Sequence, residues 1–247
     1  MPTPFTHLAV AQRLLVDEQL PPEIRARLAA EQGAFLFGNI APDARPPGRE
    51  REDTHFYVSS QVLQKPCWQM MMDKCSALLQ PTSAGQAAFL AGYIAHLAMD
   101  EIWTRHMLEP HFLHGDWATR AYRFQMLHVL LIEMDQRDYG VLEAWQYGAL
   151  AGAQPEQWLP FIDDTTLAHW RDFVAEQLKP GGVIQTLTVF GKRLSKSPDD
   201  LRRLLESPQD MYLLRENVTP EIQAALEVRM YDHAREQISQ YLAANAG

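Results

Sequence analysis

The feature that most constrains the fold is the apolar segment at residues 84–106, because it carries polar side chains at a helical spacing. Within FLAGYIAHLAMDEIWTRH (89–106), His96 and Asp100 are four residues apart, which places them about 40° apart around a helix. An ionised carboxylate is costly to bury unless it is paired, hydrogen-bonded or bound to a metal. The segment is therefore either a core helix with an ordinary polar pair or a helix that supplies metal ligands.

The rest of the chain repeats the helical pattern. Apolar residues recur at helical spacing in THLAVAQRLL, FLFGNIAP, HFYVSSQVLQ, 116–138 and 219–242, and proline or glycine residues separate these segments. Only GVIQTLTVFGKRL (182–194) has a composition typical of strands, and its periodicity does not distinguish a strand from a buried helix. Gly85, Gly92 and the alanines around them indicate closely packed helices. We predict one all-α domain over 1–247, a multi-helix bundle.

Composition narrows the function classes. The 247 residues include 22 basic and 31 acidic side chains, a net charge of −9, which argues against a nucleic-acid partner. Two cysteines, Cys67 and Cys75, are expected to be reduced thiols rather than a disulfide. The N-terminal residues lack the pattern of a secretory signal, and no apolar run is long enough to span a bilayer, so we expect a cytoplasmic protein.

Other residues of metal-binding type lie at the ends of the predicted helices. His7 is in the first turn of the first helix, Asp43 follows the apolar helix that ends near Pro42, and His55 is expected to open the next helix. Each of these has an ordinary alternative as a hydrogen-bonded core residue or a helix cap. Their accumulation in one half of the chain favours a centre for zinc or another divalent metal.

A second pair lies further along the chain. His128 and Asp135 are seven residues apart, about 20° around a helix, so they share one face. On a straight helix His106 would point about 120° away from Asp100, so it can join a site with Asp100 only if the helix ends or bends near Trp103.

The order of these motifs resembles a known family. THLAVAQRLL, FLFGNIAPDA, THFY and FLAGYIAHLAMDEIWTRH follow one another as in the bacterial zinc-dependent phospholipase C family, whose superfamily includes zinc nucleases that cut single strands. The resemblance covers residues 1 to about 135. Residues 139–247 form a helical C-terminal part to which it assigns no role.

The resemblance implies a set of ligands for two or three zinc ions. The first ion would be bound by Asp43, His55, His96 and Asp100, and Asp100 would bridge to a second ion bound by His7. His106 and His128 would bind a third. The family has a His followed four residues later by Glu, but the residue four positions after His128 is Ile132, so Asp135 is the substitute ligand. Secreted members also use the α-amino group of a processed Trp, whereas this chain begins Met-Pro.

The expected function is metal-dependent hydrolysis of a phosphoester bond through a metal-bridged hydroxide. Asp43 and Asp100 are the expected catalytic residues, and Glu101 is an alternative base that we expect to be exposed to solvent. The substrate would be a small phosphoester or a lipid headgroup.

Two other functions stay open. Metal phosphohydrolases of the His-Asp type also use histidines and aspartates on helices, but they need adjacent His and Asp, a dipeptide that is missing from the first two-thirds of this chain. The second alternative is a helical binding domain that retains a structural or vestigial metal site. The C-terminal part, 139–247, would then be a surface for a partner or for a homodimer.

Overall fold

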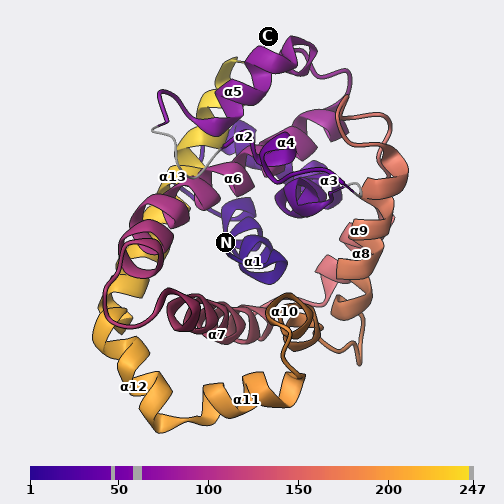
Figure 1. Ribbon diagram of the computed structural model, residues 1–247. Coiled ribbons are helices and arrows are strands. Elements are labelled where there is room, and N and C mark those ends of the chain that lie inside the picture. The colour runs from indigo at the N-terminus through magenta and orange to yellow at the C-terminus, as the bar shows by residue number, and fades with distance from the viewer. Residues whose placement is uncertain (46–47, 58–62, 245–247) are drawn as a thin grey trace.

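The long apolar segment forms helix α6 (Ala84–Trp103) of the computed structural model, which describes residues 1–45, 48–57 and 63–244 (Figure 1). The Ser83 side chain accepts a hydrogen bond from the backbone N–H of Gln86 and so caps the helix. Every residue from Gln86 to Glu101 is buried. This burial is possible because α6 packs against both α3 (Gln32–Ile40) and α13 (Pro220–Ala244).

Helices α3 and α6 approach each other closely because each has a glycine at the contact. A Cβ atom on Gly92 would lie 2.2 Å from the carbonyl oxygen of Phe35, and one on Gly38 would lie 1.9 Å from that of Phe89. Only glycine fits at such backbone-to-backbone contacts. The close packing predicted from Gly92 is confirmed.

The remaining N-terminal elements surround this pair. Helix α1 begins at Pro4 after Thr3 and contacts α3, α6 and α7. Helix α6 continues directly into a π-helical segment, η3, so the helical geometry does change after Trp103. Cys67 and Cys75 are free thiols, as predicted. The elements of this half are α1 (Pro4–Leu15), α2 (Pro22–Ala30), η1 (Ala41–Asp43), α4 (Glu52–His55), α5 (Cys67–Lys74), η2 (Ser76–Leu79), η3 (Thr104–Leu113) and α7 (Arg120–Tyr139).

The C-terminal part is also helical. Most of the 182–194 stretch, whose composition is typical of strands, forms helix α10, which begins at Thr186, and the described residues contain no strand. The predicted all-α fold is therefore confirmed. Helices α7 to α13 run around the outside of α1 in Figure 1. They comprise α8 (Trp145–Gly152), α9 (Asp164–Leu178), α10 (Thr186–Leu194), α11 (Pro198–Glu206), α12 (Pro208–Asn217) and α13. None of the helices in the described chain is long and apolar enough to cross a membrane.

One helix boundary differs from the prediction. His55 ends helix α4 instead of opening a helix, because Phe56 adopts a left-handed conformation with φ of 56°. Residues 58–62 of the predicted segment lie outside the described residues. The short helix matters for function because it turns the imidazole of His55 inward.

Candidate metal centre

Helix α6 supplies the two residues at the middle of the site. His96 and Asp100 are 1% and 4% exposed, and His96 Nε2 lies 3.3 Å from Asp100 Oδ2. The opposite ring nitrogen, His96 Nδ1, lies 2.8 Å from the carbonyl oxygen of Asn39, where it donates a hydrogen bond. This bond places the Nδ1 proton toward Asn39 and leaves Nε2 facing Asp100. Burial alone would lower the pKa of His96, but the negative charge of Asp100 raises it, so a metal would displace a proton from Nε2 when it binds. The close contact at Gly92 brings the Asn39 carbonyl within reach.

The turn after α4 brings His55 to the same point. His55 Nε2 lies 3.3 Å from both His96 Nε2 and Asp100 Oδ2, and 3.6 Å from Asp43 Oδ1. Its Nδ1 lies 2.9 Å from the hydroxyl oxygen of Thr54, so Nε2 again faces the site. The Tyr93 hydroxyl donates a hydrogen bond of 2.6 Å to the Thr54 carbonyl and so attaches α4 to α6.

His7 comes from α1 and is completely buried. Its ring stacks on that of His96 with 3.7 Å between centroids, and its Nε2 lies 3.5 Å from Asp100 Oδ1. Among the described residues neither ring nitrogen of His7 has a hydrogen-bond partner. The contact with Asp100 is long for a hydrogen bond, and a buried imidazole held by so weak a contact is costly, so a bound ligand would offset its burial.

The five side chains form two overlapping groups of possible ligands whose atoms lie within 4.8 Å of one another: His7, His96 and Asp100, and Asp43, His55 and His96. Tetrahedral zinc with bonds of 2.0–2.1 Å separates its ligand atoms by about 3.4 Å. The contacts of 3.3–3.6 Å among His55, His96, Asp100 and Asp43 are close to this separation. The residues therefore fit a divalent metal, and their nitrogen and oxygen atoms suit zinc.

The charges of the site favour the same chemistry. Burial, with the positive charge of Arg51 on His55 and of His96 on His7, lowers the pKa of both His7 and His55 to about 4. Both rings are therefore neutral at pH 7, the form that binds metals. Burial would raise the pKa of Asp100, but His96 and Arg51 hold it well below its usual range. Arg51 also donates a hydrogen bond to Asp100 Oδ2.

The structure brings together five of the eight predicted ligands and leaves the other three apart. His106 Nε2 lies 2.9 Å from the guanidinium of Arg229, away from both groups. His128 lies on α7, where its Nδ1 donates to the Phe124 carbonyl at 2.7 Å. Asp135 is buried and accepts hydrogen bonds from the hydroxyls of Thr3 and Thr186. A third group of metal ligands is not found among the described residues.

The expectation that Glu101 is exposed is wrong. The side chain is 5% exposed, accepts a hydrogen bond from the Cys67 backbone N–H and pairs with Arg105 at 3.2 Å. It points away from the site because it follows Asp100 by one residue, about 100° around the helix.

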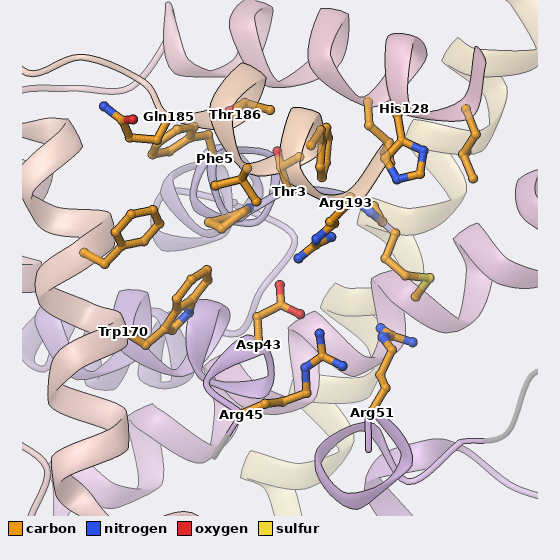
Figure 2. A pocket seen from close by; sticks show the side chains of 18 of the residues that line it. Thr3, Phe5, Asp43, Arg45, Arg51, His128, Trp170, Gln185, Thr186 and Arg193 are labelled. Carbon is orange, nitrogen blue, oxygen red and sulfur yellow. The ribbon is translucent and has the colours of Figure 1, made fainter. Parts of the chain in front are cut away.

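A cavity of about 340 Å³ adjoins the candidate site at Asp43 and Arg51 (Figure 2). Asp43 and Arg51 belong both to the candidate site and to the wall of this cavity. Arg45, Arg193 and Trp170 line other parts of the wall. Sequence reasoning missed these arginines. The positions of Arg45 and Arg51 could have indicated a role near the site, because both lie in the short segment between the predicted ligands Asp43 and His55. Arg193 had no such indication, because it comes from α10 in the C-terminal part.

The comparisons with known proteins agree with this geometry. A sequence model of the zinc-dependent phospholipase C family matches residues 6–166, which include His7, Asp43, His55, His96 and Asp100. Neither a curated protein nor a solved structure matches the chain.

Proposed function

Because this chain belongs to the zinc-dependent phospholipase C family, we propose that it is a zinc-dependent hydrolase of phosphoester bonds. The observation that carries the proposal is the meeting of side chains from α1, η1, α4 and α6 at one buried point, with their ligand atoms 3.3–3.6 Å apart. The shift of the His7 and His55 pKa values to about 4 adds support, because it keeps these rings ready to bind a cation.

We assign two ions to the centre. His55, His96 and Asp43 would hold one, together with Asp100 Oδ2, and His7 would share the other with Asp100 Oδ1. The two oxygens of Asp100 face different histidines, which suits a bridging carboxylate. When bound, zinc supplies Lewis acidity and lowers the pKa of water toward 7.

The protein residues would then position the reactants. Burial would raise the pKa of Asp43, but His96 and His55 lower it, so this carboxylate is ionised at neutral pH. It lies where the histidines meet the cavity and can accept a hydrogen bond from the attacking water. The Arg51 guanidinium lines the same edge and can donate to an oxygen of the phosphate as negative charge develops there.

The test is hydrolysis of bis(p-nitrophenyl) phosphate by the purified protein, with zinc content measured on the same sample. Asp100→Asn should lower kcat/KM by at least about 100-fold and lower the bound zinc, because Asp100 contacts all three histidines. Asp17→Asn is the matched control: the Asp17 side chain is only 8% exposed and pairs with an arginine, Arg235, but it belongs to neither group of candidate ligands. Its activity should stay within about twofold of wild type.

Other outcomes reject the proposal in different ways. Tight zinc without turnover of any phosphoester would favour a binding domain with a structural metal site. Turnover that survives Asp100→Asn at the wild-type rate would place the reaction at another site. A protein that binds no divalent metal would contradict both the hydrolase and the metal-containing binding domain.

A further inference from the structure

Three arginines from three different segments line the cavity beside the proposed centre. Arg45 follows η1, Arg51 precedes α4 and Arg193 lies on α10. Figure 2 shows Arg193 on one side of Asp43, with Arg45 and Arg51 on the other. Arg51 pairs with Asp100, but within the described part of the chain neither Arg45 nor Arg193 forms an ion pair with a carboxylate. The cavity therefore holds positive charge that the protein itself does not neutralise.

The charge balance of the cavity wall is the reverse of that of the whole chain. Asp43 is the one acidic side chain among the described residues that line the cavity, against three guanidiniums. The chain as a whole has a charge of −9. Partial burial and the positive charges of Arg45 and Arg51 lower the pKa of Arg193, while Asp43 raises it, so these groups act on one another. Arg45 and Arg193 are both exposed to solvent, so water screens part of this repulsion, and the remaining positive potential favours an anionic ligand.

One phosphodiester cannot supply that anion alone. It carries a single negative charge, and Arg51, which contacts Asp100, is the arginine closest to the proposed reaction centre. Asp43, in turn, would be neutralised by the metal. Arg45 and Arg193 therefore remain for a further anionic group, and guanidinium forms its strongest hydrogen bonds with phosphate and carboxylate oxygens.

The cavity also has an apolar wall. Phe124, Leu127, Phe173 and Phe190 line it, together with Trp170. The indole N–H of Trp170 donates a hydrogen bond of 2.8 Å to the Ile40 carbonyl, so its ring presents carbon atoms to the cavity. Because the polar atom is already used, this wall favours an alkyl or aromatic group of the ligand.

We propose that the cavity selects a phosphoester that has an apolar group and a second anionic group beyond the bond to be cleaved, and that Arg193 is the residue that determines this specificity. The inference rests on the proposed hydrolase function and adds the charge of the substrate to it. Arg193 lies outside residues 6–166, so the family match does not imply this role.

The experiment uses three short-chain lipids that differ only in headgroup: dihexanoyl phosphatidylcholine, phosphatidylglycerol and phosphatidylinositol 4-phosphate. Dissociation constants are measured by titration calorimetry with the purified zinc-containing protein. The inositol 4-phosphate lipid should bind at least about 10-fold more tightly than the glycerol lipid, since a charge-assisted hydrogen bond contributes this much. The choline lipid, with its cationic headgroup, should bind most weakly.

Arg193→Gln should reduce the preference for the inositol 4-phosphate lipid to within about twofold and leave binding of the glycerol lipid nearly unchanged. Arg193→Lys should restore part of it, because the charge returns without the planar guanidinium. Arg203→Gln is the control: this arginine is exposed on α11 and pairs only with Asp200 among the described carboxylates, so the preference should persist.

Three results would overturn the proposal: equal affinity for the three headgroups, preference for choline, or an equal loss for all lipids in Arg193→Gln. Glycerophosphoinositol 4-phosphate, which lacks acyl chains, separates a lipid from a soluble phosphoester. Binding as tight as that of the lipid would refute the role of the apolar wall. Release of dihexanoylglycerol is followed in parallel: headgroup selectivity without release contradicts the proposed function alone, whereas release without selectivity contradicts this inference alone.

Discussion

Substitution of Gly92 by alanine tests whether the contact between α3 and α6 builds the site. The added Cβ atom would lie 2.2 Å from the Phe35 carbonyl oxygen and 2.9 Å from the Asn39 backbone nitrogen. Ordinary contacts begin near 3.4 Å, so the two helices must separate by roughly 1 Å. That movement would lengthen the hydrogen bond of 2.8 Å between His96 Nδ1 and the Asn39 carbonyl.

Two effects of opposite sign decide the stability. Alanine is a better helix former than glycine by about 1 kcal/mol. Overpacking costs about 1–3 kcal/mol, and the upper end or more applies here because the obstructing atoms belong to backbone on a neighbouring helix. We expect a net loss of about 2 kcal/mol, which corresponds to a fall in Tm of about 4–8 °C for a chain of this size.

The metal should respond as well. Loss of a hydrogen bond to a metal-binding histidine typically costs 10–100-fold in metal affinity, so the Kd for zinc of Gly92→Ala should rise by about that factor. Thermal unfolding by circular dichroism and zinc competition with a chromophoric chelator measure the two quantities. The control is Gly148→Ala in α8, where no described atom lies within 4 Å of the new Cβ. It should raise stability by about 0.5–1 kcal/mol without changing zinc affinity. If Gly92→Ala behaves like this control, the account of the contact is wrong.

Three further predictions follow from the same contacts. Thr54→Val removes the hydroxyl beside His55 Nδ1 and should weaken zinc binding about 10-fold, as measured by chelator competition. Burial, despite hydrogen bonds from Thr186 and Thr3, raises the pKa of Asp135 from 3.8 to about 6, so the folded protein keeps a proton that the unfolded chain releases. The free energy of unfolding is therefore unaffected by this shift below pH 3.8 and falls by about 3 kcal/mol as the pH rises through 6. Urea unfolding at several pH values should show that Asp135→Asn removes this pH dependence. Removal of zinc with a chelator should lower the Tm and zinc should restore it, because a ligand that binds only the folded state stabilises it; an unchanged Tm would contradict a metal at the centre.

The sequence predicts the part of the site that lies within one helix better than the part that depends on contacts between helices. The spacing of His96 and Asp100 places both on one helix face, and the structure keeps them there. The approach of His7 to them depends on how α1 packs, which no local pattern specifies. The prediction that His7 joins His96 and Asp100 came from the order of the family motifs.

The third predicted site shows the limit of spacing arguments. His128 and Asp135 do share a helix, but Asp135 accepts hydrogen bonds from Thr3 and Thr186. His106 lies in the π-helical segment and meets Arg229 of α13. These partners come from distant parts of the chain, so the spacing of the candidate ligands could not indicate them. Arg193 escaped prediction for the same reason.

X-ray absorption at the zinc edge of the purified protein measures the central arrangement most directly. We predict a shell of nitrogen and oxygen atoms at about 2.0–2.1 Å, with the scattering of imidazole rings and no sulfur at about 2.3 Å. His96→Ala should weaken that imidazole signal, because two of the three proposed imidazole ligands remain. A spectrum with a sulfur shell, which Cys67 or Cys75 would supply, or a protein without zinc, would contradict the assignment of these histidines to a metal.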